Sequence, residues 1–539
     1  MTYCVIVFLK ERESMNKISK NFIFKFLLFL NLFFINNIYS TETNKTYLLS
    51  RSTGVNLSME YTTFNNFVNY RDDKRARDNK DNSFGAHIQA TPYYLESNNG
   101  KDIGKYFGFD DKNILRIARN NIAGYDLDFR YMVHDNVNTA NTNAIVKLDP
   151  KFESYGLRLD YYQKLEKFLD GLYFKIAIPI SYVKTDVRLN IADQAGYFVA
   201  GTNTDLYKYF DGTYNLPVGN ARAQAALEYA KISQHKFSKT SVADLDLVLG
   251  CKFIDRDKYY AIINFALTIP TNNEAGAGYM FDVNVGNGSY WALGGGLEGM
   301  MRLFGKTNDH NLNLVAVANY RYLFEGRAER TMGLLNPDGT RANWGQYYLV
   351  GEIGTAVSTQ QLQPAANVLT QRVKLAPGSQ LDSMIYLNYK YSGFTAELGY
   401  NFFWRDDEQI SLKNEWQNNV YGVAILDQDM TIAGGATFAN TGFAATAVPV
   451  NGGSMGYINN DPDNTAFTAA GTVATRAYGL DEGVGAASSQ NTHKIFAGLG
   501  YGFYDFKFPC MLGIGGAYEF NGDDGIENWQ VYGKVGLKF

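Results

Sequence analysis

Cysteine, histidine and proline are scarce in this sequence. Of its 539 residues, 3 are Cys, 5 are His and 11 are Pro. Cys251 and Cys510 lie far apart in apolar surroundings, so neither a disulfide framework nor a cysteine metal site is expected. The sequence contains no HExxH or Walker motif. We therefore expect no enzyme, no metal and no cofactor, although catalytic groups brought together from distant strands would leave no local motif.

Long apolar runs are also almost absent. The one continuous run, 26–35, follows three Lys residues and precedes the small Ser40. It has about half of the roughly 20 residues that a membrane-spanning helix needs, so it is typical of a signal peptide. We predict that residues 1–40 are removed on export and that the mature chain starts at Thr41, with Met15 as an alternative initiator.

Glycine and aromatic residues are abundant. The chain has 52 Gly, 39 Tyr and 36 Phe, and its formal net charge is −4. Nothing in this balance suggests a nucleic-acid partner. The mean hydropathy of −0.25 fits a membrane barrel, because only half of each strand must be apolar.

The last strand separates two environments. Alternate residues of 526–539 form an apolar row with an aromatic ring at each end: Trp529, Val531, Gly533, Val535, Leu537 and Phe539. The residues between them are polar or small, and this two-residue period indicates a β-strand with unlike faces. A strand between lipid and a wet interior explains both rows, because rings favour the headgroup level.

The same alternation recurs along the chain and predicts an all-β fold, a transmembrane antiparallel up-and-down β-barrel. Clear strands are 172–182, 243–253, 259–269, 290–304 and 394–405, and further candidates are 84–94, 123–133, 153–163, 310–324, 381–391, 493–504 and 507–520. Because the strand number must be even, a partner before 84–94 is needed. We place it at 55–61, which gives fourteen strands, with twelve as the fallback.

Connections between these strands alternate in length, as short periplasmic turns and long extracellular loops do. Counting back from a periplasmic carboxy terminus, short turns fall near 504–506, 392–393, 305–309, 254–257 and 164–171. The loops 189–240, 325–380 and 406–492 are long. Residues 95–122 are too long for a turn and are a candidate plug or periplasmic segment within a single barrel domain, 41–539.

Two resemblances follow from these residues. The terminal Phe539 after alternating apolar residues resembles the ending of bacterial outer-membrane barrels, which implies recognition by the barrel-assembly machinery. Segments 265–271 and 288–299 resemble strands of the long-chain fatty-acid transporter superfamily and its aromatic-uptake relatives. That resemblance implies fourteen strands and an amino-terminal plug, and it transfers no ligand site.

The inward rows carry charges of both signs. Such charges are costly at bilayer depth unless they face water or each other, so they must point into a polar interior. They either brace the lumen with salt bridges or line a water-filled passage. The predicted pore-lining residues are Asp128, Arg130, Arg158, Asp160, Lys175, Asp244, Asp246, Lys252, Glu298, Arg302, Arg321, Lys390, Glu397, Arg405, Lys494 and Lys534.

We therefore predict a channel in the outer membrane of a Gram-negative bacterium, through which small solutes diffuse past a mixed-charge wall. A transporter of hydrophobic solutes, such as fatty acids or aromatics, is the alternative. A surface adhesin or structural barrel acting through its long loops is a third hypothesis. The expected partners are outer-membrane lipid, the assembly machinery and small solutes, and the sequence leaves the oligomeric state open.

Overall fold

The computed structural model describes most of the chain between residues 42 and 539. The described residues are 42–52, 56–62, 85–118, 124–128, 131–133, 143–192, 206–215, 223–256, 258–272, 274, 276–305, 310–336, 338–352, 362–418, 420–423, 458–459 and 478–539. The predicted signal peptide lies outside them. None of the described helices combines the length and apolar character needed to cross a membrane.

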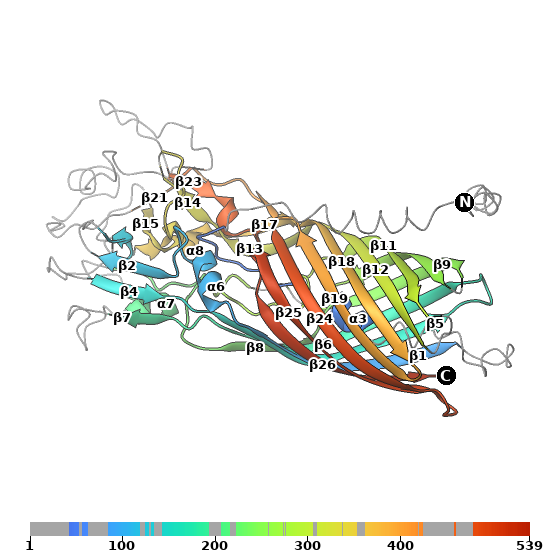
Figure 1. Cartoon of the computed structure of the whole chain (residues 1–539). Helices are drawn as coiled ribbons and strands as arrows, with labels where there is room; N and C mark the ends of the chain where they lie inside the picture. The colour runs from blue at the N-terminus through green and yellow to red at the C-terminus, as the bar shows by residue number, and fades with distance from the viewer. Residues whose placement is uncertain are drawn as a thin grey trace, which may run out of the picture.

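Twelve antiparallel strands close into one barrel (Figure 1). β1 pairs with β26 on one side and β5 on the other, so the first and last strands meet and leave no open edge. The strands are β1 (Ala86–Ser97), β5 (Lys151–Lys164), β6 (Leu172–Asp186), β9 (Leu245–Asp255), β10 (Tyr259–Ile269), β11 (Ala292–Phe304), β12 (His310–Leu323), β18 (Gly378–Tyr391), β19 (Phe394–Arg405), β24 (Gln490–Phe503), β25 (Cys510–Asp523) and β26 (Asn528–Lys538). The predicted barrel fold is confirmed, with the fallback strand number.

Two of the fourteen predicted strands are not barrel strands. Residues 57–61 form the α-helix α3 (Leu57–Tyr61), because the Asn56 side chain accepts a hydrogen bond from the Met59 amide and caps the first turn. In 123–133 the described backbone includes only the two-residue strand β3 (Leu127–Asp128), which pairs outside the barrel. The other twelve predictions match the barrel strands.

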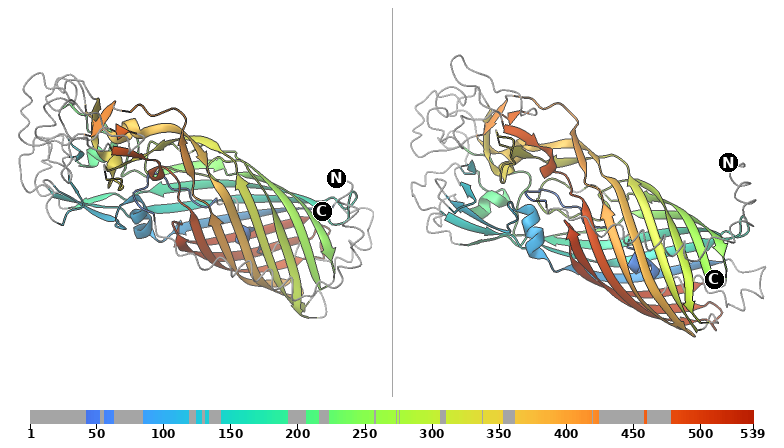
Figure 2. Two further views of the ribbon diagram at one scale, coloured as in Figure 1. Left: turned by 90° about the horizontal axis from the view of Figure 1, so that it is seen from above. Right: turned by 45° about the horizontal axis from the view of Figure 1, so that its top comes forward.

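The two ends of the barrel differ in the length of their connections (Figure 2). Five hairpins with short connections, β5–β6, β9–β10, β11–β12, β18–β19 and β24–β25, turn at the end that holds the carboxy terminus, here called the turn end. The other end, the loop end, holds the described residues of the longer connections, among them 98–118, 143–150, 223–244, 276–291, 338–352, 362–377 and 478–489. By the rule for such barrels, the turn end is periplasmic and the loop end is extracellular.

Apolar side chains cover the outside of the barrel. Exposed residues at alternate positions include Leu249, Ile263, Leu297, Leu398, Ile495, Ile514, Val531 and Val535. The residues between them point inward, and many are polar or charged and buried. A closed barrel with an apolar outside and a polar inside fits a bilayer, and barrels of this kind belong to bacterial outer membranes. The chain is an outer-membrane β-barrel.

The loop end is a folded layer of its own. It holds four small sheets: β3 with β2 (Ile114–Ala118), β4 (Asn143–Lys147) and β7 (Asn190–Ala192); β13 (Gly326–Thr331), β17 (Thr370–Ala376) and β20 (Gln409–Leu412); β14 (Gly333–Leu335), β22 (Ile458–Asn459) and β23 (Tyr478–Asp481); and β15 (Leu349–Glu352), β16 (Gln363–Pro364) and β21 (Tyr421–Val423). Helices α6 (Gly100–Phe107), α7 (Leu206–Asp211) and α8 (Ala365–Leu369) and the 3-10 turns η4 (Gly345–Tyr347) and η5 (Glu482–Val484) accompany them. Strand β8 (Phe237–Val242) continues β9 along β6.

A ring-rich core packs this layer. Trp344 contacts Phe109, Phe210 and Tyr347 edge to face, with ring centroids 5.2 to 5.9 Å apart. The segment 95–122, our candidate for a plug or periplasmic segment, contributes α6 and β2 to this layer at the loop end. The segment that enters the barrel is a different one, described below.

The outward row predicts a stability difference. Leu398 is 58% exposed on the outside of β19, so Leu398→Arg places a charge against hydrocarbon and should lower the unfolding free energy by about 2–4 kcal/mol. Asn414→Arg, on an exposed loop-end residue, should change it little. Denaturant titration of both variants in lipid vesicles measures the difference, and equal losses would show that our outward row is wrong.

Candidate functional site

The amino-terminal segment 42–62, here called the plug, occupies the lumen. At the loop end the Asn44 and Lys45 amides donate to the carbonyls of Gly108 and Tyr106. Farther in, the Leu49 carbonyl accepts hydrogen bonds from Arg405 and Gln490 of the barrel wall. Helix α3 then lies among inward residues of the barrel strands. The plug therefore runs from the loop end into the middle of the barrel.

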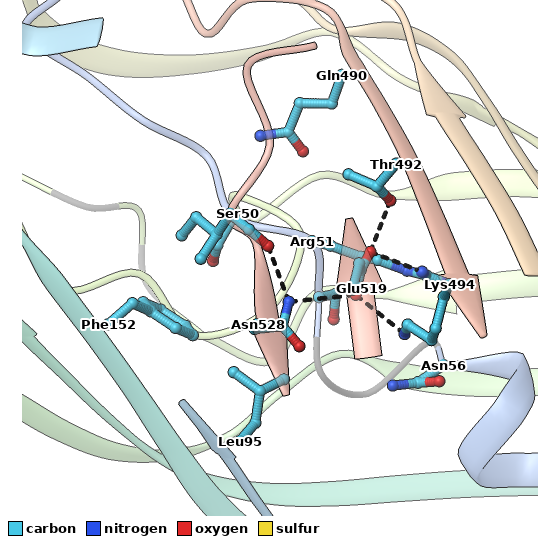
Figure 3. Close-up of a pocket in the computed structure, with 12 residues that line it drawn as sticks. Ser50, Arg51, Asn56, Leu95, Phe152, Gln490, Thr492, Lys494, Glu519 and Asn528 are labelled. Atoms are coloured by element: carbon cyan, nitrogen blue, oxygen red, sulfur yellow. Dashed lines mark hydrogen bonds and ion pairs between the residues drawn. The ribbon is translucent and has the colours of Figure 1, made fainter. Parts of the chain in front are cut away.

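The outer anchor of the plug is Arg51 (Figure 3). Its Nη2 lies 2.8 Å from Asp382 Oδ2 and 2.9 Å from Asn401 Oδ1, and its Nη1 lies 3.0 Å from Glu519 Oε1. Lys494 Nζ lies 3.0 Å from the other Glu519 oxygen. We call Arg51, Asp382, Asn401, Lys494 and Glu519 the Arg51 cluster, in which two cations balance two carboxylates. Buried charges persist only when paired in this way.

The inner anchor is Glu60, and it carries the opposite charge. Its carboxylate accepts a hydrogen bond from Arg158 Nη2 at 2.7 Å and another from Lys175 Nζ. Arg158 also pairs with Asp160 at 2.8 Å, and Lys534 Nζ donates to the Glu60 carbonyl at 2.7 Å. We call Glu60, Arg158, Asp160, Lys175 and Lys534 the Glu60 cluster. The wall contributes an excess of positive charge here, which the plug carboxylate offsets.

An apolar belt lies on the lumen wall beside α3. Leu57 and Tyr61, one helical turn apart, pack on inward side chains of β12, β18 and β24. The belt consists of Val248, Tyr260, Ile262 and Ala266 on one side and Val315, Val317, Met384, Tyr386 and Phe496 on the other. All nine side chains are buried. The inward surface is therefore not polar throughout, as the charged rows had suggested.

At the loop end the plug is also held by polar contacts outside the membrane. The Glu42 amide donates to Asp524 Oδ2 at 3.2 Å, and Arg341 lies 3.3 Å from the Glu42 carboxylate. Burial, together with the neighbouring Asp523 carboxylate, raises the pKa of Asp524 to about 7. Asp524 is thus mostly protonated below pH 7, which limits repulsion among these acids.

Most of the predicted pore-lining residues are inside the barrel and buried. The Arg51 and Glu60 clusters contain Arg158, Asp160, Lys175, Lys494 and Lys534, and Arg405 holds the plug backbone. Elsewhere Asp246 pairs with Arg321 at 2.6 Å, Glu298 accepts from Tyr61 and Tyr260, and Glu397 accepts from Asn388. Asp244 accepts from Ser52, Lys390 lies over the Tyr504 ring, and Lys252 and Arg302 are half-buried.

Two predicted residues are not shown on the lumen wall. Asp128 is in β3 at the loop end, outside the barrel. Arg130 lies outside the described residues. Among the residues that are described, the inward charges are engaged with each other and with the plug. Of the two alternatives, these residues fit a lumen braced by ion pairs, and the plug occupies part of its interior.

Four residues of the two anchors were missed in the sequence. Glu519 and Asp382 occupy inward positions of predicted strands, so extending the alternation to 507–520 and 381–391 could have found them. Arg51 and Glu60 lie on the plug; Glu60 falls in the predicted strand 55–61, and Arg51 lies before it, where no element was predicted. The signal that could have corrected this is Asn56, a residue that favours the position before a helix.

No protein-family model matches the sequence, and no curated protein matches it. Solved outer-membrane barrels do resemble it. An outer membrane channel from Pseudomonas putida F1 is 9% identical, with a TM-score of 0.33, over 84% of this chain and 95% of that one. The toluene transporter TodX of Pseudomonas putida is 9% identical over 93% and 99%, with a TM-score of 0.30. A FadL homologue of Pseudomonas aeruginosa is 10% identical over 92% and 99%, with a TM-score of 0.28.

The inner anchor predicts how firmly the plug is held. Glu60→Ala leaves Lys175 and Arg158 without the plug carboxylate, which should weaken plug docking by about 3–5 kcal/mol. Labelling of Met59→Cys, buried at 0% exposure in the docked plug, should then accelerate in the Glu60→Ala background.

Glu96 provides a matched control. It pairs with Lys151 on the outer surface of the barrel, where an ion pair is worth about 0–1 kcal/mol. Glu96→Ala should leave the labelling of Met59→Cys unchanged. Equal labelling rates in both backgrounds would show that Glu60 does not hold the plug.

Proposed function

We propose that the protein is a plugged outer-membrane channel for small hydrophobic solutes, and that its plug moves aside when a solute passes. The observation that carries this proposal is the apolar belt. When α3 withdraws, the five wall side chains that pack on Leu57 and Tyr61 become available to a solute, and apolar contacts of this kind bind hydrophobic molecules.

The filled lumen supports this function over that of a general porin. In a general porin the inward charges face water, whereas here the Arg51 and Glu60 clusters are buried beneath the plug. Hydrated ions need a continuous aqueous path, so the resting barrel should conduct poorly. A hydrophobic solute gains from contact with the belt, and that gain can offset part of the cost of moving the plug.

The folded loop end favours a second candidate function, attachment at the cell surface. Four small sheets and a ring-rich core make this layer more than a set of short connections. Surface attachment requires no solute passage. If removal of the small sheets abolished attachment while uptake stayed unchanged, this candidate would replace the channel.

Conductance and uptake together test the channel. Wild-type protein should be nearly silent in planar lipid bilayers, while cells that carry it should take up a hydrophobic fluorescent dye such as N-phenyl-1-naphthylamine faster than cells without it. The double variant Val315→Thr/Val317→Thr adds two hydroxyls to the belt, and we expect it to slow dye uptake several-fold, by about 1–2 kcal/mol of lost contact.

The control for this experiment is Val531→Thr/Val535→Thr. It makes the same chemical change on the outside of β26, where both residues are about half exposed, and should leave uptake unchanged. Steady ionic currents through the wild-type protein, or equal uptake by both double variants, would contradict the proposed function.

A further inference from the structure

The wall of the barrel surrounds the Arg51 guanidinium as it would a bound ligand. Asp382, Asn401 and Glu519 contact its two terminal nitrogens at 2.8 to 3.0 Å, and its Cζ lies 4.6 Å from the centroid of the Phe403 ring. Two carboxylates, an amide oxygen and the face of a ring are the groups that recognise a flat organic cation. We call Asp382, Asn401, Phe403 and Glu519 the cation seat.

The seat is held in place without Arg51. Asn401 Nδ2 donates to Asp382 Oδ1 at 2.6 Å and to the Ser383 carbonyl at 2.8 Å. Glu519 accepts from Thr492 at 2.6 Å, besides its pairing with Lys494. All these partners belong to the barrel wall, so the seat should keep its shape when the plug withdraws. Such preorganisation is what allows a site to bind a ligand from solution.

The charge of the seat also requires a cation. Within the Arg51 cluster, removal of Arg51 leaves the carboxylates of Asp382 and Glu519 with the single ammonium of Lys494. One buried negative charge is then uncompensated, which is costly in a low-dielectric interior. The state with the plug withdrawn is therefore stabilised by any cation that fits between the two carboxylates.

The seat lies next to the apolar belt. Met384 is the next inward residue after Asp382 on β18, and Phe496 is the next after Lys494 on β24. Alternate residues of a strand are about 7 Å apart, so a molecule slightly longer than that spacing reaches both the seat and the belt. The two surfaces together suit a molecule with a cationic head and an apolar body.

We propose that the cation seat binds the guanidinium or ammonium head of a solute, and that Arg51 occupies this seat while the channel is at rest. This inference rests on the proposed function and narrows its solute class to hydrophobic organic cations. A solute that reaches the seat replaces Arg51 charge for charge, so the charges of the Arg51 cluster stay balanced while the plug is displaced.

Chemical rescue tests the seat. Arg51→Ala should open the channel to ions in planar bilayers. Added guanidinium chloride should then bind in the empty seat and reduce this ionic current. The comparison is the current in sodium chloride at the same ionic strength. Phenethylguanidinium should act at lower concentration than guanidinium, because its ring reaches the belt.

The double variant Arg51→Ala/Asp382→Asn supplies the control. In this variant the plug is displaced as in Arg51→Ala, and the seat has lost one carboxylate. The guanidinium concentration that gives half block should therefore be about tenfold higher than for Arg51→Ala, which corresponds to one lost charged hydrogen bond. Equal block of both variants, or no block of Arg51→Ala, overturns the proposal. If Arg51→Ala does not form barrels with the mobility of folded protein on unheated gels, Arg51→Gln replaces it with the same expected results.

Failure of the seat is distinguishable from failure of the channel. Suppose that wild-type protein shows almost no conductance and that the belt variant slows dye uptake, but that guanidinium does not block Arg51→Ala. The proposed channel function is then supported, and the cation seat is wrong. If wild-type protein conducts steadily while guanidinium blocks Arg51→Ala, the seat stands and the plugged channel falls.

Discussion

Two opposite charges on one short segment reduce the charge imbalance inside the barrel. Arg51 offsets an excess of carboxylates on one part of the wall, and Glu60 offsets an excess of cations on another. Neither set of wall charges would be tolerated when buried without its partner on the plug, because an unpaired charge in the interior costs several kcal/mol. The position of the plug is thus fixed by electrostatics at two separate levels of the lumen.

Between these two levels the contact is of another kind. Helix α3 presents Leu57 and Tyr61 to the apolar belt, so its position depends on apolar area removed from water as well as on ion pairs. A general diffusion pore has little use for a wide apolar stretch of inner wall. A plug matched in charge to the wall, together with the apolar belt, is the physical basis of the function we propose.

The sequence predicts the barrel much better than it predicts the lumen. In strands such as β10 and β19 apolar and polar residues alternate over ten or more positions. Only a β-strand fits so long an alternation, so twelve strands could be placed. Leu57, Met59 and Tyr61 also alternate, but in five residues the strand period and the helix period cannot be separated. In the helix, Leu57 and Tyr61 face one wall and Met59 faces Tyr93 and Tyr532 on another.

The ion pairs were beyond the sequence for a different reason. The inward direction of Arg158 and Lys175 follows from strand parity, but their partner Glu60 is 98 and 115 residues away along the chain. Arg51 and Asp382 are 331 residues apart. Parity gives the direction of a side chain and says nothing about what fills the space in front of it.

The path of residues 42–62 has a consequence for assembly. The segment begins at the loop end and reaches the middle of the closed ring of strands, whereas β1, which follows it in the sequence, starts at the turn end and is itself part of that ring. The plug is thus enclosed by a ring made of later residues of the same chain. Either β1 and β26 pair last, around a plug that is already in place, or the plug must enter a barrel that has already closed. Biogenesis of this protein therefore has an order of events that an empty barrel would not need.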